Sequence, residues 1–327
     1  MNWTGKRVLV TGAGGFIGSH LTERLVELGA DVRAFIHYNA LGSWGWLDSS
    51  PVREAIQVAT GDVTDQDSVR QAMQEREIVF HLAALIAIPY SYQAPASYVR
   101  TNVEGTLNVL QAARDAGAEC IVHTSTSEVY GTAQCVPIDE AHPLQGQSPY
   151  SASKIGADKM VEAFHRSFGL PVVTVRPFNT FGPRQSARAV IPTIITQLLA
   201  DQTVRLGSLK PTRDLNFFAN TVDGFVLAAS TPAAIGRTIN LGSGREISIG
   251  DLAQLIARLM NKPICIEGED VRVRPKGSEV ERLLADNQLA HKLLNWEPLV
   301  NLEDGLQRTI EWIQQHPERY HPNVYVI

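Results

Sequence analysis

Residues 7–18 read RVLVTGAGGFIG, a run of branched apolar residues followed by a glycine-rich turn. The apolar run predicts a buried strand, and the residues after the glycines have the spacing of a helix. Gly12, Gly15 and Gly18 allow the backbone to turn sharply and to come close to a pyrophosphate, whose charge then lies at the positive end of the helix. This strand-turn-helix unit therefore predicts a site for a dinucleotide.

Short β-branched runs alternate with helix-like patterns along the first half of the chain. Beyond the first strand, we expect strands at residues 31–36, 56–60, 78–82, 120–124 and 172–176. Such alternation with short connections predicts parallel strands joined by right-handed helical crossovers. The expected fold class is α/β, with a doubly wound parallel sheet of the Rossmann type.

The regular alternation of strand-like and helix-like segments ends after Pro177, where proline and glycine recur between more widely spaced elements. Two more helices are expected near residues 249–260 and 302–314. We therefore predict a smaller, mixed α/β domain beside the parallel sheet. The expected division assigns residues 1–177 and 214–240 to the dinucleotide-binding domain, and residues 178–213 and 241–327 to a substrate-binding domain.

The composition narrows the classes of function. The chain has 327 residues, of which 44% are apolar, enough for a full hydrophobic core without disulfides. Its 29 basic and 34 acidic residues give a net charge of -5, which argues against a surface for nucleic acid or anionic lipid. Neither a membrane span nor a signal peptide is indicated. Because Cys120, Cys135 and Cys265 are widely spaced and lack metal-ligand spacing, we expect a reduced, cytoplasmic protein without a metal site.

The residue that closes the second strand bears on the choice of cofactor. An acidic side chain there would bind the adenosine ribose and select NAD over NADP, but Ile36 is at the expected position and His37 follows it. His37 and Arg33 could meet a 2′-phosphate, and a solvated strand end accounts for both equally well. NAD and NADP therefore both stay open. His81, at the end of the fourth strand, is interpreted as a packed residue rather than a catalytic one.

A tyrosine and a lysine lie four residues apart in the sequence YSASK (150–154), on one face of a helix expected to begin after Pro149. A positively charged Lys154 would lower the pKa of Tyr150 and could also hold the nicotinamide ribose. The ionised phenol would then take the proton from a sugar hydroxyl while hydride leaves the same carbon.

The segment TSTSEVYG (124–131) follows the fifth expected strand. Thr126 can hydrogen-bond the reacting hydroxyl. Glu128 adds a carboxylate that simple oxidation does not require, and a carboxylate can remove a proton from carbon. A salt bridge within a loop is the alternative explanation for Glu128.

The glycine spacing and the later Tyr-x-x-x-Lys pair resemble the extended short-chain dehydrogenase/reductase superfamily over nearly the whole chain. The resemblance implies that a tightly held, recycled NAD or NADP contacts the glycine-rich turn, the strand ends and the helix that carries the tyrosine. The residues it implies are Gly12, Gly15, Phe16, Ile17, Gly18, His37, Asp62, Val63, Leu82, Ala83, Ala84, Thr124, Tyr150, Lys154 and Pro177.

The triplet Thr126, Ser127 and Glu128 resembles that of nucleotide-sugar 4,6-dehydratases, which makes these three residues catalytic candidates together with Tyr150 and Lys154. The resemblance implies oxidation at sugar carbon 4, removal of the carbon 5 proton by Glu128, loss of water from carbon 6 and return of the hydride to carbon 6. Ser127 matches the GDP-mannose dehydratase pattern, whereas the thymidine-linked glucose branch has aspartate there. Glu128 would therefore act as both base and acid.

Two later segments resemble the substrate-binding parts of this superfamily. RPFNTFGPR (176–184) is similar to the hinge in which an asparagine meets the sugar diphosphate, and RPKGSEV (274–280) to the C-terminal segment of GDP-mannose dehydratases with two extra residues. A nucleotide diphosphate requires an apolar wall for its base and guanidinium groups for its phosphate oxygens. The expected substrate-binding residues are Thr126, Asn179, Arg184, Val190, Ile191, Pro192, Arg213 and Arg274.

Together with SWGWLD (43–48), these features resemble most closely the N-acetylglucosamine nucleotide 4,6-dehydratases of legionaminic and related nonulosonic acid pathways. We therefore expect a lyase that acts on UDP- or GDP-N-acetylglucosamine. A nucleotide-sugar 4-epimerase or a UDP-glucuronate decarboxylase, which also carries a Thr-Ser-Glu-Val-Tyr-Gly string, is the alternative. A non-catalytic dinucleotide-sensing regulator is disfavoured, because the catalytic candidates occur together. The two tryptophans are expected to lie in a packed loop or a subunit contact.

Two helical segments, around residues 98–116 and 150–168, carry more apolar residues than one buried face requires. The resemblance implies a homodimer in which both segments enter a four-helix interface. A monomer in which the sheet and loops cover both stripes is the alternative. The apolar residues concerned are Val99, Val103, Leu107, Val109, Leu110, Ile155, Met160, Val161 and Phe164.

Overall fold

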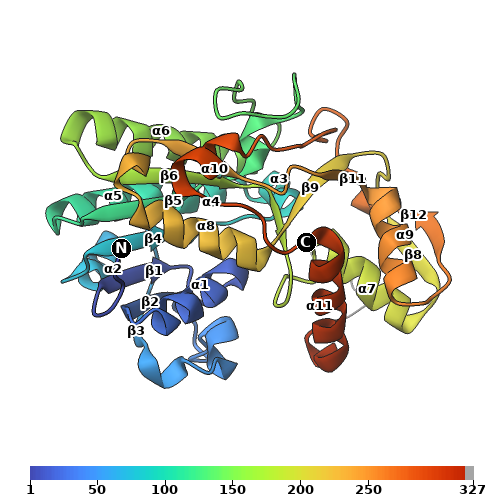
Figure 1. Ribbon diagram of the computed structural model, residues 1–327, viewed down its shortest axis with the longest axis horizontal. Helices are drawn as coiled ribbons and strands as arrows, with labels where there is room; N and C mark the ends of the chain where they lie inside the picture. The colour runs from blue at the N-terminus through green and yellow to red at the C-terminus, as the bar shows by residue number, and fades with distance from the viewer. Residues whose placement is uncertain (321–327) are drawn as a thin grey trace.

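The computed structural model describes residues 1–320 and is built around a seven-stranded parallel sheet with helices on both faces (Figure 1). The strand order is β10-β6-β5-β4-β1-β2-β3, which confirms the expected α/β fold class. The strands are β1 (Arg7–Thr11), β2 (Asp31–His37), β3 (Gln57–Gly61), β4 (Ile78–His81), β5 (Cys120–Thr124), β6 (Val172–Pro177) and β10 (Thr238–Leu241).

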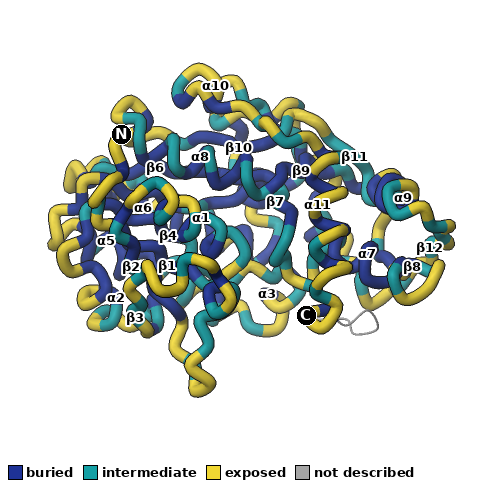
Figure 2. The backbone as a smooth tube through the Cα atoms, turned by 60° about the horizontal axis from the view of Figure 1, so that its bottom comes forward, coloured by how far each residue is buried: buried dark blue, intermediate teal, exposed yellow. Residues whose placement is uncertain are grey.

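Both faces of this sheet are buried, because successive side chains of a strand point to opposite sides. In β1, Val8 and Val10 pack in one core, while Leu9 between them packs in the other. The strands accordingly run through the buried centre of the molecule (Figure 2). The first core is covered by α1 (Phe16–Glu27), α8 (Phe218–Ser230) and α10 (Gln288–Leu294), and the second by α2 (Gln66–Met73), α5 (Gly105–Asp115) and α6 (Pro149–Phe168).

A smaller mixed region lies beyond the carboxyl ends of the large sheet and has a hydrophobic core of its own, around Ile194, Phe217 and Leu306. It holds a three-stranded sheet in the order β11-β9-β7 and a parallel pair, β12-β8. Its elements are β7 (Asn179–Phe181), α7 (Val190–Ala200), β8 (Thr203–Leu206), β9 (Thr212–Phe217), β11 (Glu246–Ser248), α9 (Ile249–Leu259), β12 (Cys265–Gly268) and α11 (Leu302–Gln315).

The packing differs at two points from the expected division of the chain. All of β9 lies in the smaller sheet, although its residues from 214 onward were expected in the dinucleotide-binding domain. Conversely, Ala290, Leu294 and Trp296 pack in a core of the large sheet, although the second domain was expected to include them. The chain therefore crosses between the two regions more often than the expected division into two domains assumes.

The expected helix at 98–116 is not uniform. After α3 (Ile88–Gln93) and α4 (Pro95–Tyr98), residues Val99–Glu104 form a π-helical segment that leads into α5. The segment carries the buried Asn102, whose side chain bonds both the N–H and the C=O of Leu85 and donates to Ser153 Oγ, each at 2.9 Å. One amide therefore ties the loop after β4 to helix α6.

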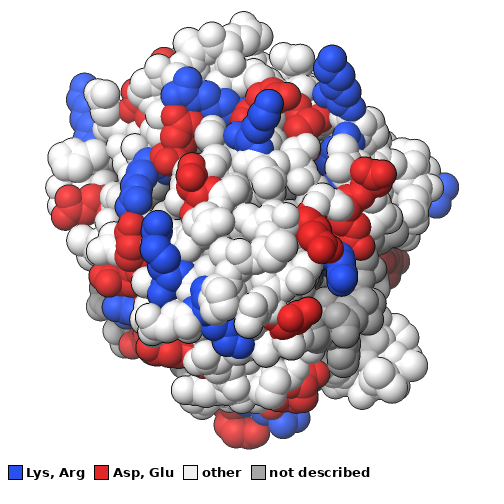
Figure 3. Space-filling view, turned by 90° about the vertical axis from the view of Figure 1, so that its right-hand side faces the viewer, with Lys and Arg blue, Asp and Glu red and all other residues white. Residues whose placement is uncertain are grey.

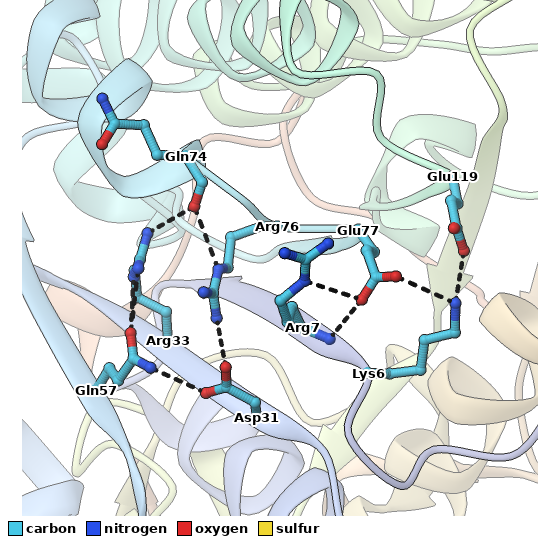
Figure 4. Close-up of polar contacts among 9 residues, drawn as sticks. All are labelled: Lys6, Arg7, Asp31, Arg33, Gln57, Gln74, Arg76, Glu77 and Glu119. Atoms are coloured by element: carbon cyan, nitrogen blue, oxygen red, sulfur yellow. Dashed lines mark hydrogen bonds and ion pairs between the residues drawn. The ribbon is translucent and has the colours of Figure 1, made fainter.

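Arg33 is the third residue of β2, near the amino end of that strand and away from the carboxyl ends where a doubly wound sheet binds its ligands. Figure 4 shows its polar contacts. Its guanidinium donates to the carbonyl oxygens of Ala72 and Gln74, at 3.0 and 2.9 Å, and to the side chain of Gln57. The suggestion that Arg33 meets a 2′-phosphate is therefore wrong.

None of the helices within residues 1–320 is long and apolar enough to cross a membrane. On the face shown in Figure 3, acidic and basic side chains are interspersed rather than gathered in one broad patch of a single sign.

Candidate active site

A cleft of about 1310 Å³ lies between the carboxyl ends of the parallel strands and the smaller region. Thirteen of the residues expected to bind the cofactor line it, as do the catalytic candidates. These thirteen are Gly12, Gly15, Phe16, Ile17, Gly18, His37, Leu82, Ala83, Ala84, Thr124, Tyr150, Lys154 and Pro177. The structure thus brings together residues that are far apart in the sequence.

The glycine-rich turn forms a close-fitting cradle. A Cβ atom on Gly12, whose φ is +69°, would lie 2.8 Å from Ala83 N, and one on Gly18 would lie 2.2 Å from Gly12 O. Helix α1 then begins without a side-chain cap, so the N–H groups of its first turn face the site for an anion. This geometry fits the pyrophosphate of a dinucleotide.

Asp62 and Val63 do not line the cleft. Val63 is buried in the core, where its side chain contacts the position of Gly105. Asp62 lies behind His37, with 3.7 Å between His37 Nδ1 and Asp62 Oδ2, and its other oxygen accepts from Thr64. A contact of Asp62 with the adenosine part of a cofactor stays a prediction.

His81 is a packed residue, as expected. Its ring lies between two hydroxyls, with Nδ1 2.8 Å from Thr11 Oγ1 and Nε2 3.0 Å from Thr106 Oγ1. Because Thr11 Oγ1 already accepts from the N–H groups of Leu82 and Ala83, it donates to Nδ1, and Nε2 carries the ring proton. Burial lowers the pKa of His81 well below its ordinary value, so the ring is neutral.

The catalytic candidates lie on two elements. Ser148 caps α6 in a capping box with Ser151, so the helix begins at Pro149, which places Tyr150 in its first turn. The segment after β5 turns at Thr126, which accepts from Glu128 N–H at 3.2 Å. In the catalytic set, Glu128 is 8% exposed, Tyr150 7% and Lys154 4%. These groups are therefore largely shielded from water.

The pKa of Tyr150 differs from the expectation. Burial raises it above the ordinary tyrosine value; a hydrogen bond with Thr126 acts in the opposite direction, and nearby Glu128 raises it further. The charge of Lys154, which was expected to lower this pKa, does not offset the burial of both groups. In this state of the protein Tyr150 is a neutral phenol, able to donate as well as accept.

Lys154 is itself shifted by burial, which lowers its pKa to about 8, while the charge of Asp158 acts in the opposite direction. Its Nζ donates to Thr124 O at 2.7 Å. The ammonium is therefore charged below about pH 8 and loses its proton above it, so a fall in its contribution is expected on the alkaline side.

Two arginines and a glutamate lie together in one wall of the cleft, here called the substrate wall because the arginines are expected to bind substrate. Arg213 Nη2 donates to Glu279 Oε1 at 3.1 Å, and Arg274 Nη1 lies 3.6 Å from the same oxygen. Both guanidinium groups thus converge on one carboxylate oxygen at the cleft surface. Burial lowers the pKa of Arg213, with Arg274 acting in the same direction and Glu128 and Glu279 opposing it.

Several buried polar atoms around the cleft have no hydrogen-bond partner within the described chain. They are Thr124 Oγ1, Asn179 Oδ1, Gln185 Oε1 and Arg274 Nη1. Because unpaired buried polar atoms are costly, their gathering at one surface fits the binding of a polar ligand there. The residues therefore fit both a dinucleotide and a phosphorylated substrate.

Arg184 and Pro192, expected to bind substrate, do not line the cleft. The guanidinium of Arg184 turns to helix α1, where it donates to Ser19 Oγ at 3.1 Å and to Glu23 Oε1 at 2.9 Å. Pro192 is buried within the packing of α7, although its neighbours Val190 and Ile191 do line the cleft. Arg184 therefore holds the hinge segment against the large domain.

Other cleft residues were missed by the sequence analysis. Arg188 lines the cleft, and no motif marks it. Glu279 was quoted within a motif but given no role. Tyr92 of α3 also lines the cleft and shares a 2.6 Å hydrogen bond with Ser278 Oγ, which links the two walls.

Comparison with known proteins agrees with this site. The family model described as GDP-mannose 4,6 dehydratase matches residues 9–309. A UDP-glucose 4-epimerase of Mycolicibacterium smegmatis is 33% identical, over 94% of this chain and 98% of the relative. The solved dTDP-glucose 4,6-dehydratase DesIV of Streptomyces venezuelae, with NAD bound, superposes with a TM-score of 0.89 at 29% identity, covering 97% of this chain and 99% of its own. The epimerase Mth375 of Methanothermobacter thermautotrophicus also gives 0.89, at 32% identity, covering 97% and 94%.

The parallel sheet, the glycine cradle and the Tyr-Lys pair in a two-domain cleft define an extended short-chain dehydrogenase/reductase. Within that class, the chain belongs to the GDP-mannose 4,6-dehydratase family, which includes nucleotide-sugar dehydratases and epimerases.

The contrast between Arg274 and Arg184 gives a test of the substrate wall. Arg274→Ala should weaken the binding of UDP or GDP about tenfold or more, because a charged donor to a phosphate oxygen is lost. Arg184→Ala, the control, should leave that affinity unchanged and lower the melting temperature, because the partly buried ion pair with Glu23 is lost. Isothermal titration calorimetry measures both affinities; an equal loss in the two variants would contradict the assignment.

Proposed function

We propose that the protein is a nucleotide-sugar 4,6-dehydratase that converts UDP- or GDP-N-acetylglucosamine into the 4-keto-6-deoxy sugar. One observation carries the proposal, the position of Glu128. Its carboxylate lies at the cleft surface beside Thr126 and Tyr150, and among residues 1–320 it forms no ion pair within 4.0 Å. A carboxylate held for a loop salt bridge would have such a partner, so this one is free to take a proton from substrate.

The chain's own groups supply the proton transfers of this reaction. Thr126 and Tyr150 hydrogen-bond the hydroxyl on carbon 4. Tyr150 first releases its own phenol proton to solvent, and the resulting phenolate takes the proton of that hydroxyl. The oxidised carbon 4 acidifies the proton on carbon 5, which Glu128 removes. Glu128, now protonated, gives the proton to the hydroxyl that leaves carbon 6 as water, so the carboxylate ends as it began. When the hydride returns to carbon 6, carbon 5 takes up one proton, which balances the proton that Tyr150 removed from the carbon 4 hydroxyl. NAD, when bound, supplies the hydride acceptor at carbon 4 and the hydride donor at carbon 6.

We assign the cofactor as NAD rather than NADP. The Arg33 guanidinium is hydrogen-bonded to Ala72 O and Gln74 O near the amino ends of the strands, so it does not reach a 2′-phosphate at the carboxyl ends. Asp62 Oδ2 lies 3.7 Å from His37 Nδ1, and its negative charge disfavours a phosphate group beside His37. The solved relative DesIV holds NAD, which agrees with this choice.

A 4-epimerase is the second candidate, because one relative compared above is a UDP-glucose 4-epimerase and the solved structure Mth375 is called an epimerase. It would use the same Tyr150 and Lys154 but no acid-base group at carbon 5. A UDP-glucuronate decarboxylase would likewise oxidise carbon 4 and then lose carbon dioxide. The three reactions differ in product: loss of water, an isomer of unchanged mass, or loss of carbon dioxide.

We further propose a cytoplasmic homodimer. Segment 99–104 and α5 pack beside α6, and Val103, Leu107, Ile155 and Met160 on these elements are only partly buried. Val99 and Phe168 are each 55% exposed. In contrast, Val109, Leu110, Val161 and Phe164 face the sheet and are unavailable to a partner. The partly covered residues leave an apolar strip that a second copy would bury.

Glu128→Gln should lower the rate of water loss by roughly a hundredfold or more, because a positioned acid-base group is removed. Oxidation at carbon 4 and NAD binding should survive. Mass spectrometry of the product checks this, with Glu140→Gln as the matched control, since Glu140 is a partly buried carboxylate outside the cleft that accepts from Asn240 N–H. Product formation at the wild-type rate in Glu128→Gln would remove Glu128 from the mechanism.

Tyr150→Phe should lose the first hydride transfer, because the carbon 4 hydroxyl no longer has a group to take its proton. Single-turnover mixing with substrate, followed by the absorbance of reduced nicotinamide, measures this step. Tyr90→Phe, on α3 and outside the cleft lining, is the control. If reduced nicotinamide formed at the wild-type rate in Tyr150→Phe, another group would be the base.

Light scattering at micromolar concentration should give about twice the 35.8 kDa mass of the chain. Val99→Glu should shift the mass toward that of one chain without unfolding the protein, because Val99 is exposed in the protomer. A monomer mass for the unaltered protein would reject the dimer.

A further inference from the structure

Residues 39–48, here called the tryptophan loop, follow β2 and lie against the glycine-rich turn. The backbone N–H of Trp46 donates to Gly14 O at 3.0 Å. A Cβ on Gly14 would lie 2.4 Å from Trp44 O, and one on Gly45 would lie 2.4 Å from Gly14 O. The two backbones are therefore in direct contact, which explains why both positions are glycine.

The tryptophan loop is held in shape by its own side chains. Asn39 accepts from Ser43 N–H at 3.1 Å and donates to Ser43 O at 2.8 Å. Asp48 accepts from Ser43 Oγ at 2.6 Å and from Trp44 N–H at 2.9 Å, and these bonds lower the pKa of its carboxyl. The loop is thus a compact unit rather than a loose connection.

The other side of the tryptophan loop contacts the smaller region. The Trp46 ring packs edge to face on Trp312 of α11, with 5.4 Å between centroids and 73° between planes. The Arg319 guanidinium lies 5.2 Å from the Trp46 centroid. Trp312 is in turn stacked on His316 at 4.3 Å. A loop of the large domain is therefore fastened to α11 of the smaller region.

Between these two attachments the tryptophan loop forms part of the cleft wall. Asn39, Leu41, Ser43, Trp44 and Gly45 line the cleft beside the glycine-rich turn, and Leu41 is 92% exposed. A dinucleotide seated on the turn would lie against this wall. Its exit past the wall would require the loop to move, and the contact with Trp312 opposes that movement.

We propose that Trp46 and Trp312 are positioning residues that fasten the tryptophan loop over the glycine-rich turn and thereby slow the release of bound NAD. The inference rests on the proposed function in one respect, that the cofactor is NAD and is regenerated in each turnover, so fast release is not needed. It does not depend on whether the reaction is dehydration or epimerisation.

The test is the rate of NAD exchange in the whole enzyme without substrate. Protein loaded with radiolabelled NAD is mixed with excess unlabelled NAD, and retained label is measured with time. Trp46→Ala and Trp312→Ala should each release NAD about tenfold faster, the size expected for loss of an aromatic pair. The double variant should release it no faster than Trp46→Ala, because that variant already removes the contact between the two rings.

Two controls keep the result specific. Trp312→Phe keeps an aromatic ring against Trp46 and should exchange NAD at nearly the wild-type rate. Leu299→Ala removes an apolar side chain that is 74% exposed and lines no part of the cleft, and it should have no effect. Both tryptophans are only partly buried, so the alanine variants are expected to fold, which thermal unfolding checks.

Wild-type exchange rates in both alanine variants would overturn the proposal. Faster release in Trp46→Ala alone would also overturn it, because Trp312 would then have no part in fastening the tryptophan loop. Additive effects in the double variant would show two separate contacts and contradict the shared fastening. A wild-type enzyme that retains no NAD would refute the cofactor assignment and this inference together, whereas failure to dehydrate substrate would leave the exchange result standing.

Discussion

The arrangement of the cleft depends on one buried carboxylate, that of Asp158 in α6. It accepts from Ser125 Oγ at 2.8 Å, from His123 Nε2 at 3.1 Å and from Arg176 Nη2 at 3.0 Å. These partners lie on β5, on the segment that follows it and on β6, so one side chain sets the position of the helix against the strands. Removing it would leave the Arg176 charge buried and unpaired, at a cost of roughly 3–5 kcal/mol.

The same network reaches the edge of the sheet and Lys154. Arg176 Nη1 donates to Tyr130 Oη at 2.9 Å, and that hydroxyl donates to Asn240 Oδ1 of β10 at 2.7 Å. Asp158 follows Lys154 by one helical turn, and its charge opposes the loss of the lysine proton. Bonds from His123, with the charges of Arg176 and Lys154, outweigh burial and hold the pKa of Asp158 at about 2. The carboxylate therefore stays ionised throughout the pH range in which the enzyme would work.

The sequence indicated the parts of the fold that depend on local patterns. Six strands of the large sheet were expected within one residue of their observed ends, because each is a short β-branched run. The seventh, β10, was not recognised as a strand, since four residues at a sheet edge carry little periodic signal. The π-helical segment was also unforeseen, because its sequence resembles ordinary helix and its distinguishing contact, Asn102 with Leu85, is set by the tertiary fold.

Contacts between distant residues explain the remaining differences at the site. Arg184 is drawn from the cleft by Glu23, 161 residues away, and Glu279 meets Arg213 from 66 residues away. Nor does a motif reveal that burial raises the pKa of Tyr150, since the spacing to Lys154 says nothing about how much water remains. The motifs predicted which residues gather at the cleft, whereas their hydrogen-bond partners and protonation states could be read only from the folded structure.

The central claim is that hydride moves within one sugar, from carbon 4 to carbon 6, with loss of water. The most direct measurement uses UDP- and GDP-N-acetylglucosamine deuterated at carbon 4, with the product analysed by mass spectrometry and NMR. The account predicts a product that has lost one water and carries the deuterium on carbon 6. A product of unchanged mass with deuterium still on carbon 4, from either nucleotide sugar, would contradict it and favour epimerisation.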